Sequence, residues 1–537
     1  MINARSAPCD AGVVNAAGRG AACDRRTRFW IMAATDLGSA MAFIDGSAVN
    51  VALPALERDL GASLGAMQWV VNAYMLFLAA LLLVGGAAGD RFGRRKIFVI
   101  GIALFAAASL GCGAAAGIGQ LIAARAVQGI GGALLVPSTL AIIGTAFEPA
   151  ERGRAIGTWA AISALATAIG PVLGGWLIDA WSWRAIFLIN PPIALVTLWL
   201  AERHIAESRD PDAPPALDWA GASLAFAGLG ALVFGLIAGG DLGWRHPVVL
   251  AALLAAPPLL AAFVWVEARS RAPMMPPALF RSRTFTGVNL VTLLLYAALG
   301  GAFFFLPFEF IALRGDSVAA SGAAFLPFTV IMGGLSRWSG GLLERFSARS
   351  LLTAGPLIAA LGFALLALPD AHSSFWTAFL PAMIVLALGM TLSVAPLTTT
   401  VMNAVPSHQA GVASGINNAV ARVATLLAVA VLGVVAVTAF DRGLDRRIAA
   451  PQLDATVRDA LAARHGKLAA ASSDEHGSAE ERRQIEEIAG ASLLGAVRTA
   501  YAAATLLALA AALCAALMIP PREISRSPQP PAVPPRK

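Results

Sequence analysis

Charged residues are scarce in this chain. Only 13% of its 537 residues are Asp, Glu, Lys or Arg, whereas soluble domains carry about 25%. Hydrophobic residues make up 58% of the sequence, and apolar stretches of membrane-spanning length recur from end to end. This composition excludes an ordinary soluble domain. It predicts an all-α polytopic membrane protein, because backbone polar groups in lipid must find their hydrogen bonds within helices.

Cysteine and histidine are also rare, and neither forms a cluster. The four cysteines contain no Cys-x-x-Cys pair, so no metal site and no disulfide framework is predicted. No Ser/His/Asp set stands out, and the chain is not expected to be an enzyme. The Gly-rich run 129–132 lies inside an apolar stretch and lacks the context of a phosphate-binding loop. With no nucleotide-binding domain and no cofactor expected, an ion gradient must supply the energy for any transport.

Fourteen apolar stretches predict fourteen transmembrane helices. Their approximate ranges are 30–54, 66–88, 97–117, 119–144, 155–178, 184–201, 219–239, 247–267, 285–313, 322–342, 351–369, 376–403, 411–438 and 498–519. The loops after the second, fourth, eighth and tenth spans are rich in arginine, and the alternate short loops are poor in it. Since basic loops stay in the cytoplasm, both termini are predicted to be cytoplasmic, in the cell (inner) membrane. The net charge of +7 is thereby assigned to topology, and no nucleic acid partner is expected.

Two loop segments repeat the same pattern. Residues 86–95 after the second span and 340–349 after the tenth both contain Gly, an acid, Arg, Phe and a further base at matching positions. Duplicated halves are typical of secondary transporters, so two pseudo-symmetric six-helix bundles are predicted, with two extra central helices. The predicted divisions are a cytoplasmic tail, the N-terminal bundle, the extra helices with their linkers, the C-terminal bundle and a second tail, at 1–29, 30–201, 202–284, 285–519 and 520–537.

One predicted outer loop, 440–497, is much longer than the others. Within it, Ser478 and Glu481 have the spacing of a capping box, which would start a helix that runs toward the last span. The loop is either a lid, a site for a partner such as a periplasmic adaptor protein, or a tolerated surface insertion. The sequence leaves these alternatives open.

Asp45 is an acidic residue inside the first predicted span, 30–54. A carboxylate at bilayer depth costs about 3 kcal/mol on insertion scales, so such residues usually belong to an ion or substrate pathway. Glu309 is a second acid at membrane depth, toward the outer part of the ninth predicted span. It either binds a cationic substrate or a second proton, or it extends to the outer interface.

The loop after the second span contains a candidate conformational latch, which we call the latch motif, residues 86–96. Gly86 would allow two helices to approach closely. Asp90 stands at the C-terminal end of a predicted helix, where the helix dipole disfavours an anion, so it needs a basic partner. Arg91, Arg94 and Arg95 are within reach. The alternative is that these bases only anchor the loop inside the cell.

The latch motif is similar to the loop motif of the major facilitator superfamily, in which Gly93 also has a fixed place. Ala88 and Gly89 replace the residues usual in that family. Residues 121–132 resemble the second motif of the family, with Arg125 as its buried base. Since the first and fourth spans both line the cavity in this family, the resemblance implies that Arg125 pairs with Asp45. A purely structural arginine is the alternative.

A third motif resembles the one that this family associates with antiporters. Its characteristic residues are Gly170, Pro171, Gly174 and Gly175. Pro171 would kink the fifth span, and the glycines would admit a neighbouring helix. Together with fourteen spans and Asp45, the resemblance is to the fourteen-helix drug:proton antiporter branch, which contains multidrug efflux pumps. It covers about residues 30–438 and the last span; Gly46 and the long outer loop depart from the pattern.

The resemblance implies a proton-coupled antiporter that exports amphipathic small molecules by alternating access. Asp45, Arg125 and Glu309 are then the residues expected to handle protons or substrate. Its partners would be the substrate, protons and the lipid bilayer. A proton-coupled importer shares the fold and stays an alternative. A non-transport membrane sensor is the second alternative, although no soluble output domain is evident.

Overall fold

A computed structural model describes residues 25–521, except 148, 211–216, 271–272, 371, 406–408, 450–452, 463, 466–467 and 469–477. All regular secondary structure in these residues is helical. The predicted tails lie mostly outside the described residues, although the first helix already begins at Arg25. The first and last helices also extend well beyond the predicted spans.

The first half of the chain forms helices α2 to α8. Their bounds are Arg25–Leu60 (α2), Leu64–Phe92 (α3), Arg94–Gly113 (α4), Ile118–Ala146 (α5), Pro149–Ala180 (α6), Ala185–Leu188 (α7) and Asn190–His204 (α8). The predicted sixth span is thus broken in two. Prolines stand directly after Asn190, where their missing N–H groups are tolerated in a first helical turn, so a new helix starts there.

The second half follows two intervening helices, α9 (Trp219–Leu242) and α10 (Pro247–Arg269). Its main helices are Arg283–Pro307 (α11), Val318–Ala323 (α12), Leu326–Gly341 (α13), Ala348–Leu366 (α14), Leu380–Asn403 (α15), Ala410–Ile448 (α16), Ala455–Ala462 (α17) and Ala479–Met518 (α18). Short helical turns add Pro277–Arg281 (η1), Phe308–Leu313 (η2), Leu342–Glu344 (η3) and Phe375–Phe379 (η4). The predicted tenth span is divided between α12 and α13.

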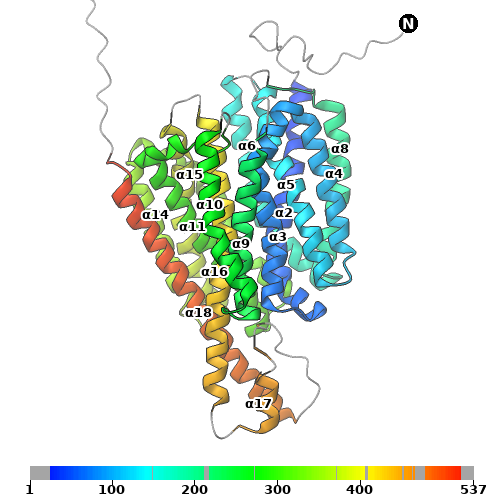
Figure 1. Cartoon of the computed structure of the whole chain (residues 1–537), viewed down its shortest axis with the longest axis vertical. Helices are drawn as coiled ribbons and strands as arrows, with labels where there is room; N and C mark the ends of the chain where they lie inside the picture. The colour runs from blue at the N-terminus through cyan, green and yellow to red at the C-terminus, as the bar shows by residue number, and fades with distance from the viewer. Residues whose placement is uncertain are drawn as a thin grey trace, which may run out of the picture.

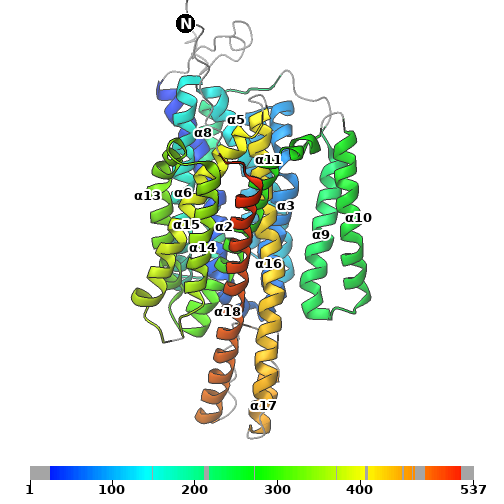
Figure 2. The ribbon, with the colours of Figure 1, turned by 90° about the vertical axis from the view of Figure 1, so that its left-hand side faces the viewer.

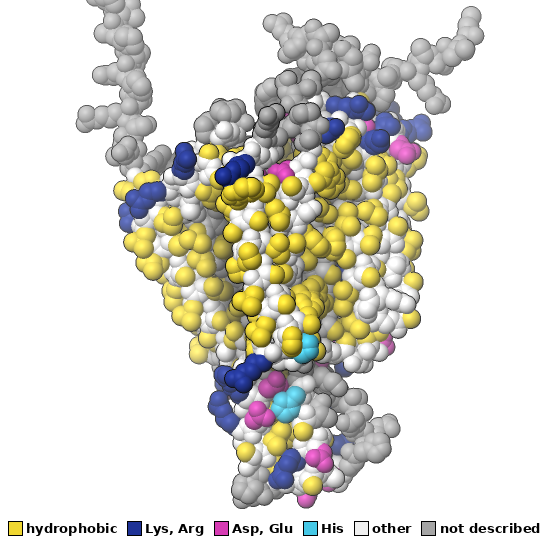
Figure 3. Space-filling view, in the orientation of Figure 1, with side chains coloured by type: hydrophobic (Ala, Val, Ile, Leu, Met, Phe, Trp, Pro, Cys, Tyr) yellow, Lys and Arg dark blue, Asp and Glu magenta, His cyan; other side chains and the backbone are white. Residues whose placement is uncertain are grey.

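Thirteen helices of the described chain are long and apolar enough to cross a membrane. Helix α6 contributes only a shorter apolar stretch among its described residues, Leu165–Ala180. The chain is therefore a multi-pass membrane protein, and the count of fourteen stays a prediction. Figure 3 shows the corresponding surface, with apolar side chains over the middle of the bundle and Lys and Arg gathered along its upper rim.

The helices pack in two groups. Helices α2, α3, α4, α5, α6 and α8 contact one another, as do α11, α13, α14, α15, α16 and α18. Helices α9 and α10 form a pair beside these groups (Figure 2), and α9 contacts α3 of the first half and α16 of the second. Helix α9 thus bridges both halves at the edge of the bundle, and α10 packs against α9.

The bundle has two distinguishable ends (Figure 1). We call the end where α2 begins and α18 finishes the termini side. At the other end, α16 and α18 project beyond the remaining helices and carry α17. We call the described residues of 440–497 the extension, and this end the extension side. The predicted capping box is confirmed, since Ser478 and Glu481 exchange hydrogen bonds and open a helix that continues into the bundle to Met518.

Candidate functional site

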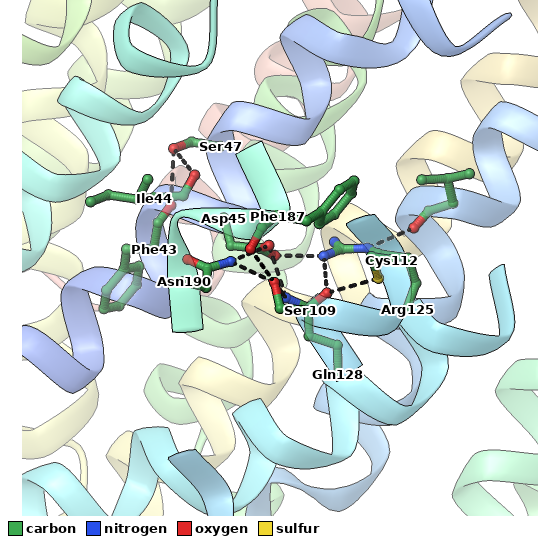
Figure 4. Close-up of polar contacts among 11 residues, drawn as sticks. Phe43, Ile44, Asp45, Ser47, Ser109, Cys112, Arg125, Gln128, Phe187 and Asn190 are labelled. Carbon is green, nitrogen blue, oxygen red and sulfur yellow. Dashed lines mark hydrogen bonds and ion pairs between the residues drawn. The ribbon is translucent and has the colours of Figure 1, made fainter. Parts of the chain in front are cut away.

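Asp45 lies in the middle of α2 with 1% of its surface exposed, and three side chains bind its carboxylate. Arg125 donates from Nη1 to Oδ2 at 2.5 Å. Gln128 and Asn190 donate to Oδ1 at 2.9 and 3.1 Å (Figure 4). Both oxygens of the carboxylate are therefore satisfied by donors from α5 and α8. The structure brings Asp45 and Arg125 into direct contact; their part in transport stays a prediction.

Arg125 is held from two further directions. Its Nε donates to the backbone carbonyl of Val70 in α3 at 3.2 Å, and its guanidinium lies 4.3 Å from the centre of the Tyr74 ring. Gln128 follows three residues later, on the same face of α5, and its Oε1 accepts from Arg125 at 2.8 Å. A buried charge pair supported in this way is expensive to break, because removal of one partner leaves the other charge without compensation.

A second layer of polar side chains supports the pair. Ser109 of α4 accepts a hydrogen bond from Asn190 at 2.9 Å and donates to the Phe187 carbonyl at 2.9 Å. The Sγ atom of Cys112 lies 3.6 Å from the Oε1 atom of Gln128. We refer to Asp45, Arg125, Gln128, Asn190 and Ser109 as the charged cluster. Sequence reasoning missed the last three, although each is a polar residue within a predicted span, which is the signal that could have found them.

The latch motif is closed on itself. Asp90 accepts from Arg94 Nε at 2.8 Å and Nη2 at 2.7 Å, so the basic partner lies one turn away in the same loop. Arg91 instead lies over the ring of Phe92, 5.1 Å from its centre. Gly93 has a φ of +118°, and a Cβ there would stand 2.6 Å from the carboxylate of Glu207. The positive φ therefore favours glycine here, and any other residue would also have to displace the Glu207 carboxylate.

Glu207 ties the latch motif to the segment that follows α8. Its carboxylate accepts from the backbone N–H groups of Arg95 and Lys96, both at 3.1 Å, at the start of α4. An anion at a helix N-terminus is favourable. One prediction in this region is wrong: the close helix contact occurs at Gly85, where a Cβ would collide with the Ala133 carbonyl, whereas a Cβ on Gly86 would meet only ordinary contacts.

The glycines of the third motif lie where α6 touches its neighbours. A Cβ on Gly170 would collide with Ser47 Oγ, and one on Gly174 would lie 2.9 Å from the Cβ of Ala48, both in α2. A Cβ on Gly175 would collide with the Val318 carbonyl at the start of α12. The predicted close approach is thus confirmed. Pro171 lies inside α6, and its carbonyl faces Gly322 of α12.

This face of α6 also joins the two halves on the extension side. Asp179 accepts from the backbone N–H groups of Val318 and Ala319 at 3.3 and 2.8 Å. Deeper in the bundle, the guanidinium of Arg422 in α16 lies 5.7 Å from the centre of the Phe43 ring in α2. Arg422 thus joins the second half of the chain to the first.

Glu309 lies in the π-helical turn η2 with 2% of its surface exposed. The hydroxyl of Tyr501 in α18 donates to its Oε2 at 2.6 Å. The alternative in which Glu309 extends to the outer interface is wrong, because this bond holds the carboxylate inside the bundle. The structure does not bring Glu309 into the charged cluster.

The second half contains its own buried polar cluster. Asn417 of α16 donates from Nδ2 to Asn289 Oδ1 at 3.1 Å and to Thr292 Oγ1 at 2.7 Å, both in α11. We call these three residues the neutral cluster. In the described part of the chain, no group of His, Cys, Asp and Glu could hold a metal ion.

Residues 35–429 match the family model described as Major Facilitator Superfamily. The chain belongs to the major facilitator superfamily. It is 35% identical over 416 residues to the multidrug resistance protein Stp of Mycobacterium tuberculosis, and the match covers 76% of each protein. It is 38% identical to a puromycin resistance protein of Streptomyces alboniger, over 76% of this chain and 82% of that one.

Solved structures of transporters resemble the chain as well. A bacterial homologue of the human lysosomal transporter Spinster, in an inward-facing and unoccupied conformation, superposes with a TM-score of 0.66. The match covers 92% of this chain and 97% of that one at 17% identity, so it shows the fold alone. Membership of the superfamily accounts for the two helix groups and for the motifs around Asp45, Asp90 and Gly170.

Proposed function

We propose that the protein exports amphipathic small molecules across the cell (inner) membrane in exchange for protons. The relatives named above are resistance proteins, which supports export of toxic compounds. The observation that carries the proposal is the buried Asp45–Arg125 pair, 2.5 Å apart within a site closed to solvent. The termini side, with its rim of basic residues, is assigned to the cytoplasm.

The charged cluster has the properties of a proton-operated switch. The carboxylate of Asp45 accepts hydrogen bonds from donors of α5 and α8, an arrangement that suits an anion. A proton on that carboxylate would remove its charge and leave Arg125 buried without a counter-ion, which is costly. Protonation therefore favours any conformation in which these helices separate or Arg125 finds water.

The contacts between the halves agree with a state that is closed on the extension side. There α6 touches α12, and Asp179 caps the first turn of α12. On the termini side, a cavity of about 950 Å³ lies between α2 and α6. Substrate would load from the cytoplasm in this state, with Asp45 ionised. A proton from outside would then bind Asp45 in the opposite state and favour release of the substrate.

The latch motif fits the same cycle. Its Asp90 is bound to Arg94 of its own loop, so in this state it does not tie the halves together. Glu309 with Tyr501 offers a second carboxylate for a proton or a cationic substrate. The division into bundles at 30–201 and 285–519, joined by the segment 202–284, belongs to the same proposal. We also place the extension outside the cell, where it would be a lid, a site for an adaptor protein or a surface insertion.

Inverted membrane vesicles with an acid interior and a pH-reporting dye would test this function. We expect lipophilic cations or neutral drugs to trigger proton release in the wild type and none in Asp45→Asn. A full coupled response in Asp45→Asn would contradict the role of this residue. Movement of the substrate out of the vesicles together with protons, driven by the same gradient, would favour the importer. A membrane potential of 100 mV adds about 2.3 kcal/mol per charge, so the dye signal should grow with it if net charge moves.

A further inference from the structure

Asp36 is an acidic residue in α2 that the mechanism above does not use. It has 7% of its surface exposed, and its Oδ1 is fully buried with no hydrogen-bond partner in the described part of the chain. It stands nine residues before Asp45. Nine residues turn a helix by about 900°, so the two carboxylates leave α2 on opposite faces. Asp36 therefore points away from the charged cluster.

Asp36 lines the cavity of about 950 Å³ between α2 and α6. Two contacts between these helices mark the limits of its surroundings. Toward the termini side, Arg28 of α2 forms an ion pair with Glu151 of α6. Three residues deeper than Asp36, Ser39 accepts a hydrogen bond from the indole of Trp159 at 2.8 Å. Asp36 thus lies between a charged contact at the mouth and an aromatic contact further inside.

Among the described charges around the cavity, none forms an ion pair with Asp36. Arg28 is paired with Glu151. Arg154, which also lines the cavity, is exposed, and no ion pair within the described residues joins it to Asp36. A buried carboxylate that lacks a partner is costly, and a ligand of opposite charge would recover that cost.

The remaining walls are mostly apolar. They include Phe29, Met32 and Leu37 of α2, Phe147 at the end of α5, and Ile162 of α6. Small-molecule sites have volumes of about 300–1,000 Å³, are largely apolar and contain a few placed polar groups. Aromatic faces also attract cations. One carboxylate among such walls is suited to a bulky organic cation with a single charge.

We propose that Asp36 and these walls form a binding site for lipophilic organic cations, open to the termini side and separate from the Asp45–Arg125 pair. The site rests on the proposed function, in which the termini side is where substrate loads. Cation and proton then bind different carboxylates of one helix. A neutral substrate would use the apolar walls and have no need of Asp36.

The test measures binding of tetraphenylphosphonium to the purified full chain in nanodiscs, without any gradient. Asp36→Asn should weaken binding by about tenfold or more, because the charge lost lies in a partly desolvated site. A neutral lipophile of similar shape, triphenylmethane, should bind wild type and Asp36→Asn within about twofold of each other, since it draws only on the apolar area. Asp59→Asn, the same substitution at the opposite and exposed end of α2, should leave both affinities unchanged.

Three results would overturn the site. They are equal cation binding by wild type and Asp36→Asn, equal loss of the cation and the neutral lipophile, and no cation binding by the wild type. If Asp36→Asn does not fold, Thr158→Lys places a positive charge on the cavity wall from α6 and should give the same selective loss. Proton release in vesicles is a separate readout. If cation binding depends on Asp36 but the cation triggers no proton release, the proposed antiport is refuted and the binding site is retained.

Discussion

The two halves of the protein bury polar side chains in different ways. In the first half, the charged cluster draws on α2, α4, α5 and α8 and contains an ion pair. In the second half, the neutral cluster joins α11 and α16 through amide and hydroxyl groups. An uncharged hydrogen bond fixes how two helices pack, and a proton does not change it. An ion pair can be cancelled by one proton, so of these two clusters it is the charged one that suits the proposed switch.

Among the variants considered, Arg125→Ala should lower the stability of the protein most. It leaves Asp45 buried without its counter-charge, and we expect a loss of about 3–5 kcal/mol in the free energy of unfolding. Asn417→Ala in the neutral cluster should cost only about 1–3 kcal/mol. Thermal unfolding of both variants in one detergent measures the difference. Equal costs would remove the distinction between the two clusters.

Next in size is the contact between α2 and α6. A methyl group on Gly170 would collide with Ser47, so Gly170→Ala should lower stability by about 1–3 kcal/mol and slow exchange. Gly157→Ala, in the same helix, meets nothing within 4 Å and should be neutral or slightly stabilising. The pair of variants separates a packing effect from helix propensity. If the two variants had equal stability and equal exchange rates, the close approach of α6 to α2 would not matter for transport.

Variants at Glu309, the second buried carboxylate, should differ less from the wild type than variants at Asp45 do. Tyr501→Phe removes the hydroxyl that donates to Glu309 and should cost about 1–3 kcal/mol in the free energy of unfolding. Glu309→Gln should retain proton-coupled exchange that Asp45→Asn loses. The vesicle assay compares the two on the same substrates. Loss of coupling in Glu309→Gln would extend the switch to the second half.

The smallest effect concerns the extension. Hydrogen bonds to the Ala462 carbonyl, and less strongly to Asp445, raise the pKa of His465 above its ordinary value, against an opposing effect of partial burial. The charged form is therefore bound in the folded extension. Its small stabilisation is complete below about pH 6.5, the ordinary pKa, and is lost as the pH rises through the raised pKa. The protection factors of α17, which are corrected for the intrinsic pH dependence of amide exchange, should be larger at low pH, and His465→Asn should abolish that change.

The fold class could be predicted from the sequence because membrane-spanning helices have a distinctive length and hydropathy. Length, hydropathy and loop charge are all local, and they located the long helices of the described chain. They missed the breaks near Asn190 and Leu326 and the parts of α16 and α18 that extend beyond their predicted spans. The charged cluster was predicted only in part. Asp45 and Arg125 stand out because charge is rare at depth. Gln128, Asn190 and Ser109 do not, since neutral polar residues are common in spans and only the fold brings these three together.

Other errors have the same origin. Gly85 and Gly86 are adjacent, and only the packed structure shows which of them faces Ala133. Glu309 stands near the end of its span, where sequence position cannot distinguish a buried carboxylate from one at the interface. Asp36 lies in the same apolar stretch as Asp45, and its lack of a partner becomes visible only in three dimensions.

The continuity of α18 has a mechanical consequence. The helix runs unbroken for 40 residues, from the capping box at Ser478 to Met518, a length of about 60 Å. Its inner part carries Tyr501, the partner of Glu309, and its outer part forms one side of the extension. A rigid rod that pivots inside the bundle sweeps its free end through a larger arc than its anchored part. If α18 pivots as one body during a conformational change, its free end would move further than Tyr501 does, so a spectroscopic label near Ser478 would report that change with the larger signal.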